Sequence, residues 1–387
     1  MSPAASALPL LLLLLPAAAR SESATKVAGS VVRSKEWVVR RGKAREEEFR
    51  GDVRYDAAGT KLSADWALYR QGPNDWHAKG NIYARRVFKE GDVVETRGKE
   101  AWHNQTTSIG RLEPAAGVLI PILHTPVQGD PDHAEGERLT WIGQSSGTLT
   151  GRARGWGPRG EFWSATAHYD RLPPVAKGLP PDESMTLTGD RPVLHSYQGG
   201  DDAAVKADKI VVFDSPRRAV FTGRALGWTL SPSTDTPKNG PIGARCGSGT
   251  ASTGPGPVAG VAALLSPLGT GRAADEEKRF WDAETAAFAA RACPWGPRVD
   301  FWADEADYAQ QPERVLTLSG GRPVLHKIDG TQSSAVKADR IVAFETTRRV
   351  VATGKVKGWI VFEKERKSSD KKKTEDKKAK KHPEKTK

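Results

Sequence analysis

Cysteine is scarce in this chain of 387 residues, which has only Cys246 and Cys293. Two cysteines cannot build the multiple disulfide bridges that hold small secreted domains together. Neither has a His or another Cys at the spacing of a zinc site, so we expect no metal and no cofactor. A single disulfide between the two cysteines stays open.

Long apolar runs are also missing. The longest, Leu10–Leu15, lies between Pro9 and Pro16 and is followed by Ala17–Ala19. A helix that spans a membrane needs roughly 20 apolar residues, so this run is too short. A short apolar core before an Ala-x-Ala pattern is typical of a secretory signal peptide. We therefore expect residues 1–19 to be a leader and the protein to be exported, with an uncleaved anchor as the alternative.

Catalytic motifs are absent as well. His195 and His326 each follow Pro-Val-Leu and precede an Asp in the next predicted strand. No Ser or Cys nucleophile motif, carboxylate pair or metal-ligand spacing accompanies them. We therefore expect a protein that is not an enzyme.

The charge is uneven. The formal net charge is +12, and from Lys364 onward 12 Lys or Arg face only 5 Asp or Glu. Such a segment has too few apolar residues to offset the entropy lost on ordering, so residues 363–387 are expected to be a disordered Lys-rich tail. The tail could contact an anionic membrane surface or simply keep the protein soluble. Nucleic-acid binding is not expected of an exported chain.

What the chain has in abundance is repetition. Residues 185–228 include MTLTGDRPVLH and VKADKIVVFDSPRRAVFTGRALGW, and residues 316–359 include LTLSGGRPVLH and VKADRIVAFETTRRVVATGKVKGW. The two copies are 131 residues apart. A repeat of this kind is one supersecondary unit that needs its neighbours to bury its apolar face.

Each copy has the pattern of a β-hairpin. Val205–Phe213 and Val336–Phe344 are short, rich in Val and Ile, and followed by turn-forming residues. A second β-branched run follows in each copy, and we expect Gly223 and Gly354 to stop it. With 39 Gly and 26 Pro in many short strands, the composition favours an all-β chain.

More divergent copies extend the pattern. KLSADWALY and WHAKGNI, within residues 61–82, form a third hairpin whose Ala-Asp pair matches the pairs at 207–208 and 338–339. GPRGEFWSATAHY and GPRVDFWADEADY, which begin at Gly157 and Gly296, also match each other. We therefore expect β-units at 27–130, 131–230 and 276–362, and a Pro/Gly-rich linker at 231–275.

On the strings KLSADWALY with WHAKGNI, GERLTW with GTLTGRAR, and VKADKIVVF with AVFTGRA, the chain resembles the OstA-like family of periplasmic lipopolysaccharide-transport proteins, which includes LptA and LptC. The resemblance implies an antiparallel β-jelly roll folded over into a trough with an apolar inside. It also implies a periplasmic carrier that binds lipopolysaccharide or a related amphiphile. Its partners would be other β-jelly-roll transport proteins, which join at exposed edge strands.

In such a trough alternate side chains point inward. The expected lipid-binding lining is apolar, and paired arginines at the hairpin returns are candidates for lipid phosphates, with plain exposed turn charges as the alternative. The lining residues are Leu62, Ala64, Trp66, Leu68, Val205, Ala207, Val211, Val336, Ala338 and Val342, and the arginines are Arg217, Arg218, Arg348 and Arg349.

Two further features keep alternatives open. The chain has 12 Trp, several at matched positions of the repeat, which either pack in a thin β-layer or stack on sugars in a secreted carbohydrate-binding or structural cell-envelope protein. Asp65, Asp208 and Asp339 recur at one position beside a turn, where an Asp more often bonds local backbone N–H groups than a ligand.

Overall fold

The computed structural model describes residues 31–42, 45–57, 59–88, 91–143, 145–172, 182–196, 202–214, 217–230, 298–310, 312–329 and 332–362. These residues form a single antiparallel sheet, so the all-β jelly-roll class predicted from the sequence is confirmed. Within those ranges no helix is long and apolar enough to cross a membrane. The strands are β1 (Val31–Arg33), β2 (Glu36–Arg41), β3 (Arg45–Ala57), β4 (Thr60–Arg70), β5 (Asp75–Val87), β6 (Val93–Asn104), β7 (Ile109–Glu113), β8 (Ile120–Thr125), β9 (Asp132–Gly136), β10 (Arg138–Ile142), β11 (Ser146–Gly157), β12 (Gly160–Leu172), β13 (Asp182–Thr188), β14 (Val193–Ser196), β15 (Asp202–Lys206), β16 (Lys209–Phe213), β17 (Arg218–Leu230), β18 (Arg298–Ala309), β19 (Val315–Ser319), β20 (Val324–Asp329), β21 (Gln332–Lys337), β22 (Arg340–Phe344), β23 (Arg349–Thr353) and β24 (Lys357–Phe362).

Several sequence predictions fall outside the described residues. These are the leader at 1–19, the linker at 231–275 and the Lys-rich tail at 363–387. Cys246 and Cys293 lie outside them too. Those predictions stay predictions.

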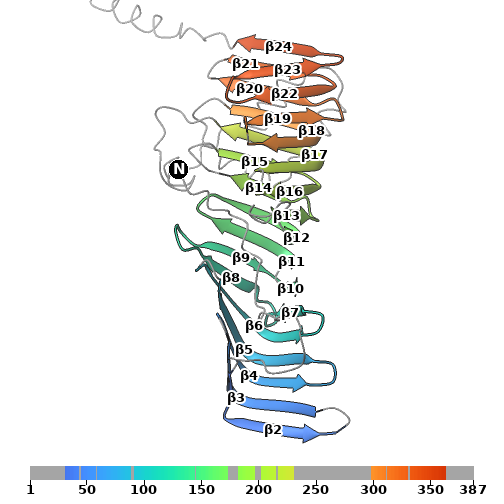
Figure 1. The fold of residues 1–387 in the computed structure, drawn as a ribbon. Helices are drawn as coiled ribbons and strands as arrows, with labels where there is room; N and C mark the ends of the chain where they lie inside the picture. The colour runs from blue at the N-terminus through green and yellow to red at the C-terminus, as the bar shows by residue number, and fades with distance from the viewer. Residues whose placement is uncertain are drawn as a thin grey trace, which may run out of the picture.

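The sheet is an elongated stack of folded-over strands (Figure 1). The eight long strands β3, β4, β5, β6, β11, β12, β17 and β18 each bend near the middle, so that their two ends belong to two facing half-sheets. Between these long strands, a level of the stack is formed by two short strands, one in each half-sheet. For example, β17 pairs with β16 through residues 218–222 and with β15 through residues 226–230. We call the half-sheet that contains β2, β16 and β23 half A, and the one that contains β1, β15 and β24 half B.

In four of the eight long strands, β3, β5, β11 and β17, the bend uses a glycine in a conformation that other residues rarely adopt. Gly223 and Arg224 have φ of 74° and 47°, and Gly80 and Asn81 have 73° and 44°. Two successive left-handed residues insert a bulge, which turns the strand and shifts its register. The shift is recorded in the pairing, between Thr222 and Ala225 in β17.

The predicted stop at Gly223 is therefore wrong. The strand β17 does not end there but continues through the bend to Leu230. At the matching Gly354, the chain leaves β23 at Thr353 and resumes as β24 at Lys357. Gly223 bends the strand, because its missing Cβ permits positive φ without ending the hydrogen-bond ladder on either side, whereas the predicted stop at Gly354 holds.

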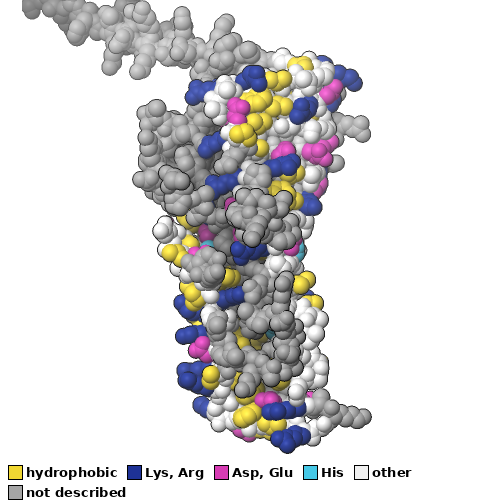
Figure 2. Space-filling view, viewed as in Figure 1, with side chains coloured by type: hydrophobic (Ala, Val, Ile, Leu, Met, Phe, Trp, Pro, Cys, Tyr) yellow, Lys and Arg dark blue, Asp and Glu magenta, His cyan; other side chains and the backbone are white. Residues whose placement is uncertain are grey.

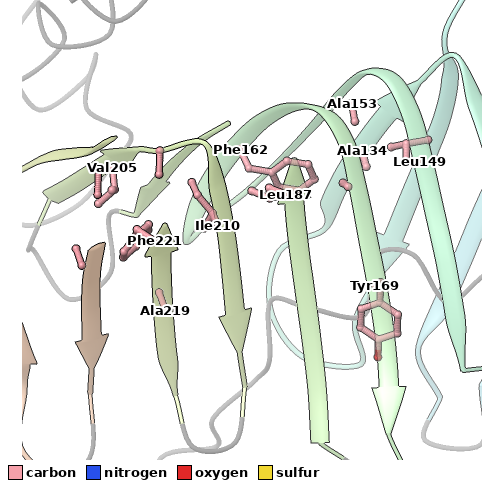
Figure 3. Close-up of a cluster of buried hydrophobic side chains, with 14 of the residues drawn as sticks. Ala134, Leu149, Ala153, Phe162, Tyr169, Leu187, Val205, Ile210, Ala219 and Phe221 are labelled. Carbon is pink, nitrogen blue, oxygen red and sulfur yellow. The ribbon is translucent and has the colours of Figure 1, made fainter. Parts of the chain in front are cut away.

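The core lies between the two halves. One cluster of buried side chains runs from Ala64 in β4 to Ile341 in β22 and contains members of both half-sheets. Figure 3 shows part of it, with Ala153, Phe162 and Leu187 beneath the arch of the bent strands and Tyr169 farther along β12. The interior is therefore continuous along most of the molecule.

Candidate functional site

Half A has an inward row next to the bend that is apolar at every level of the stack. Following the strand register from β2 to β23, the inward position next to the bend is occupied by one residue from each of sixteen strands. We call this set row A. Its members are Trp37, Phe49, Ala67, Ala78, Ala101, Leu112, Leu139, Leu149, Ala167, Leu187, Ile210, Phe221, Ala306, Leu318, Ile341 and Ala352.

Half B has a matching row of sixteen, row B. Only Thr96 in it is neither apolar nor Gly, and its hydroxyl donates to the carbonyl of Pro121 at 2.8 Å. The buried hydroxyl of Thr96 is therefore satisfied. Its members are Val32, Tyr55, Leu62, Ala84, Thr96, Ile122, Ala134, Gly155, Phe162, Leu194, Val205, Gly227, Phe301, Leu325, Val336 and Gly358.

A third inward row, row C, lies in half A one step farther from the bend and is rich in aromatic residues. It contains Tyr69, Trp76, His103, Trp141 and Tyr169, followed by Met185, Val212 and Ala219. Burial lowers the pKa of His103 to about 4 and raises the pKa of Tyr169. The indole Nε1–H of Trp141 is buried and has no hydrogen-bond partner among the described residues. Row C thus combines apolar rings with a donor that a polar ligand atom could satisfy.

Six of the ten predicted lining residues point inward. Leu62, Val205 and Val336 belong to row B, and Ala64, Ala207 and Ala338 are buried in the same cluster. Ala207 and Ala338 have no exposed surface. Their contact with lipid stays a prediction.

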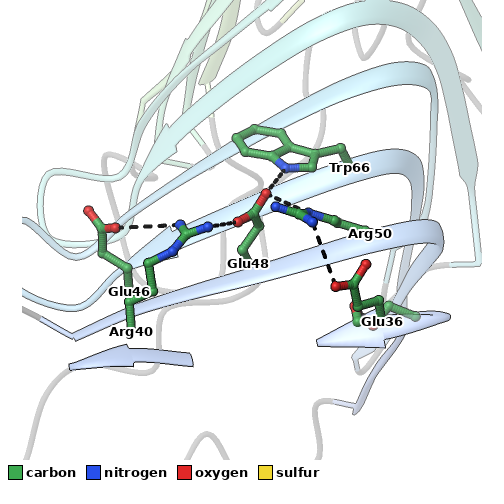
Figure 4. Close-up of polar contacts among 7 residues, drawn as sticks. Glu36, Arg40, Glu46, Glu48, Arg50 and Trp66 are labelled. Carbon is green, nitrogen blue, oxygen red and sulfur yellow. Dashed lines mark hydrogen bonds and ion pairs between the residues drawn. The ribbon is translucent and has the colours of Figure 1, made fainter. Parts of the chain in front are cut away.

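Trp66 and Leu68 lie on the opposite face of β4, so the expected alternation holds only as far as Ala64. The bulge between Ser63 and Trp66 shifts the register and brings Ala67 to the inside. On the outer face the indole Nε1–H of Trp66 donates to a carboxylate oxygen of Glu48 at 2.8 Å (Figure 4). Arg50, Trp66 and Arg40 together lower the pKa of Glu48 to about 2.

Val211 and Val342 also point outward. Each lies in register with an outer-face threonine, Thr186 and Thr317 respectively. Their neighbours Ile210 and Ile341 are the buried members of row A. The runs Ile210–Phe213 and Ile341–Phe344, apolar at every position, therefore follow period two, with valine on the outer face as well.

The four predicted phosphate-binding arginines differ in their surroundings. Arg218 makes a bidentate ion pair with Asp307 of β18, at 2.9 and 2.7 Å. The guanidinium of Arg349 lies 4.5 Å from the centre of the Phe344 ring. Arg217 and Arg348 lie in the turns before β17 and β23. Phosphate contact remains a prediction for all four.

The recurring aspartates support the bends. The backbone N–H of Asp208 donates to the carbonyl of Gly223 at 2.8 Å, and that of Asp339 donates to Gly354 at 2.9 Å. The Asp208 carboxylate pairs with Arg224, and that of Asp65 accepts from the side chain of Asn81. The prediction that these carboxylates bond local backbone N–H groups differs from these contacts: the carboxylates of Asp65 and Asp208 accept from neighbouring side chains, and the local backbone bond is made by the N–H of the aspartate itself.

The histidines and tryptophans singled out in the sequence are packed. Trp141 and Trp228 are buried, and His195 is buried with Nδ1 3.2 Å from a Glu161 oxygen. His326 is buried across the ladder from Asp300. Trp281 and Trp295 lie outside the described residues. In the described ranges, no group of three or more His, Cys, Asp or Glu is placed to hold a metal ion.

Sequence reasoning missed most of rows A and B. Leu187 and Leu318 alternate with Thr and Ser along their own strands, and this pattern could have marked them as facing inward. Ala67 and Ala78 could not have been found from the sequence, because the bulge changes which residues of their strands face inward.

Comparison with known proteins finds similarity to solved structures. No family model and no curated protein matches the chain. The fold is similar in part to the crystal structure of LptH, described as the LptA-homologous periplasmic component of the lipopolysaccharide transport device of Pseudomonas aeruginosa. The match has 16% sequence identity and a TM-score of 0.24, and it covers 29% of this chain and 74% of LptH.

Proposed function

We propose that this protein is a periplasmic carrier that holds the acyl chains of lipopolysaccharide between its half-sheets and passes them from the inner to the outer membrane. The observation that carries the proposal is the pair of rows A and B, which keep one apolar surface over sixteen successive strands.

The energetics agree with this use of the interior. Each CH₂ group moved into water costs about 0.8 kcal/mol, so an acyl chain of about twelve carbons costs on the order of 10 kcal/mol outside an apolar site. Rows A and B offer aliphatic and aromatic side chains from both half-sheets, which would replace the apolar surroundings that acyl chains have inside a membrane. The chain itself needs no chemical step for such a transfer.

In this proposal the lipid enters between the half-sheets beside row C. This row lies away from the bend, where the half-sheets are not joined by a continuous strand. Tyr and Trp present an apolar ring and a polar tip, which suits the boundary between acyl chains and a polar head group. The Nε1–H of Trp141 is the donor we assign to a head-group oxygen.

The ends of the stack would contact partner proteins. In the described part of the chain β1 and β2 pair only with β3, while β23 pairs only with β22 and β24 only with β21. Exposed edge strands accept a strand from another chain. Other β-jelly-roll transport proteins in the two membranes are the partners we propose, and the basic tail would contact the membrane surface.

Site-specific photo-crosslinking to lipopolysaccharide tests the proposal. A photoreactive phenylalanine analogue at Met185 or Val212, both facing inward, is expected to form an adduct with radiolabelled lipopolysaccharide. The matched controls are Thr186 and Val211, the next residue on each strand's opposite face. Competition by lipid A should remove the adduct, and lipid-free polysaccharide should not. Equal crosslinking from inward and outward positions, or competition by the polysaccharide alone, would refute the carrier function.

A further inference from the structure

The C-terminal end of the stack is an apolar edge. In β23, Val350 and Val351 are 47% and 38% exposed, and Val356 before β24 is 51% exposed. Figure 2 shows hydrophobic side chains near the end of the molecule where Figure 1 places β22 to β24. As far as the structure describes the chain, no strand pairs with the outer side of β23 or β24.

This edge repeats an edge that is occupied inside the same chain. β17 reads RAVFTGRALGWTL, and the chain from Arg349 reads RVVATGKVKGWIVF. The backbone bond that closes the bend is 2.8 Å at Gly223 and 2.9 Å at Gly354. On its outer side β17 pairs with β18 over both half-sheets. The edge formed by β23 and β24 therefore has the backbone arrangement that receives a strand like β18.

A glycine on each such edge makes room for a phenylalanine from the next strand. A Cβ built on Gly155 would lie 2.3 Å from the ring of Phe162, and one built on Gly227 would lie 2.3 Å from the ring of Phe301. Gly358 is the third glycine of this series, but the nearest atom to its Cβ position is the carbonyl oxygen of Ala335, at 3.6 Å. Among the described residues, none fills at the third level the space that a phenylalanine fills at the first two.

The charge of the edge repeats as well. Arg218 at the start of β17 binds Asp307 of β18 through two hydrogen bonds. Arg349 is its counterpart on β23 and is exposed beside the Phe344 ring. A strand that takes the place of β18 would satisfy Arg349 if it carried a carboxylate where β18 carries Asp307.

We propose that this edge binds a partner protein through an antiparallel β-strand with a phenylalanine opposite Gly358 and an Asp or Glu beside Arg349. A second copy of this chain fits less well, because the same register would place its Arg40 opposite Arg349 and its Arg33 opposite Lys357. Like charges directly opposite each other destabilise a strand pair. The inference deepens the partner contact of the proposed function and does not depend on lipid binding.

Binding of a labelled peptide to the full-length protein tests the inference. The probe has the sequence of residues 298–309, RVDFWADEADYA, and its binding is followed by fluorescence anisotropy. We expect saturable binding that weakens about tenfold or more with F301A in the peptide. D307R in the peptide should weaken it similarly, and the protein variant Arg349→Asp should restore binding of that peptide.

Variants of the protein locate the site. Gly358→Val should reduce peptide binding about tenfold or more while the circular dichroism spectrum and melting temperature stay unchanged, because the open space accepts the side chain. Val39→Thr, at the opposite end of the stack, is the matched control and should bind as the unchanged protein does. No saturable binding, or binding of the unchanged peptide by both Gly358→Val and Arg349→Asp as tight as by the unchanged protein, overturns the inference.

Two readouts separate the other outcomes. If sedimentation shows self-association that Gly358→Val abolishes, a second copy is the occupant and the proposed partner is wrong. Crosslinking of lipopolysaccharide from Met185 in the Gly358→Val protein reports on the carrier function independently of the edge, so failure of one proposal does not imply failure of the other.

Discussion

Glu48 shows how the outer face constrains which residues can face inward. It is 7% exposed, and its carboxylate accepts hydrogen bonds from Arg40, Arg50 and the indole of Trp66. Bonds to a charged acceptor are among the stronger ones in proteins. This contact holds Trp66 outside and so fixes the register of β4 beyond the bend.

Replacing Glu48 with Ala should therefore destabilise the protein. We expect a loss of about 1 to 2 kcal/mol in the free energy of unfolding, because the donors lose a charged acceptor but the arginines stay half-exposed to water. Urea denaturation measures it. Glu46→Ala is the control, since Glu46 only approaches Arg40 at 4.0 Å and is 39% exposed at its side chain; it should change the free energy by less than about 0.5 kcal/mol. Equal effects of the two variants would contradict this account.

The same carboxylate makes stability depend on acid pH. The pKa of Glu48 is about 2 in the folded protein and 4.5 without the contacts. A lowered carboxyl pKa stabilises the fold above pH 4.5, and the contribution is lost as the pH falls from 4.5 toward 2. Glu48→Gln should flatten that part of the curve of melting temperature against pH. An unchanged slope would show that the contacts do not hold in solution.

His103 makes the stability of the protein depend on pH in a higher range than Glu48 does. Burial lowers its pKa from 6.5 to about 4, so the unfolded chain binds more protons than the folded one between those values. Stability should therefore fall as the pH drops from 6.5 to 4, and His103→Gln should remove that part of the loss. His168, which lies 2.8 Å from Asp170 and is more exposed, provides the control substitution. The same slope in wild type and His103→Gln would be the contrary result.

At the scale of single elements, the bent strand is the unit of this fold. Repetition, β-class and the importance of Gly80, Gly223 and Gly354 could be predicted from the sequence, because copies at a constant spacing mark them. The bend that such a glycine produces could not be predicted, since a glycine after a β-branched run is typical of the end of a strand. The bulge reverses the inward phase beyond it, which is why Leu62 and Ala64 were placed correctly and Trp66 and Leu68 were not.

The apolar outer faces explain the remaining error. Val211 and Val342 carry the same side chain that an inward position would carry, and composition cannot tell the two faces of such a strand apart. Only the register with Thr186 and Thr317 separates them. Pairing between strands distant in sequence is the information that the residues alone did not contain.

The contacts between neighbouring bent strands predict a difference between equivalent glycines. Gly227→Ala should destabilise the protein by about 1 to 3 kcal/mol, because its Cβ would meet the Phe301 ring at 2.3 Å and the Ala204 carbonyl oxygen at 2.9 Å. Gly358→Ala should have little effect, since no strand covers it in the described residues. Thermal denaturation of both variants measures the difference, and similar losses would mean that the phenylalanine does not pack as described.

At the scale of the whole molecule, each level of the stack touches only the levels beside it. β11 and β12 are paired on both sides, whereas β2 and β24 each have a single neighbour among the described strands. Stacks of this kind lose structure from their ends first. Hydrogen exchange should therefore be fastest in β2, β23 and β24 and slowest in β11 and β12. Uniform exchange along the stack would indicate a single cooperative unit instead.

The length of rows A and B bears on how a cargo would travel. Sixteen strands about 4.8 Å apart extend over about 70 Å, while an acyl chain that fills half a bilayer core needs about 15 Å. In the proposed carrier, nearly every level offers similar apolar surroundings, so we expect no level to bind an acyl chain much more tightly than the next, and the rows are long enough for more than one chain. The measured stoichiometry should then exceed one lipid per polypeptide. A lipid that enters at one end of the stack would displace the lipids already bound toward the other end.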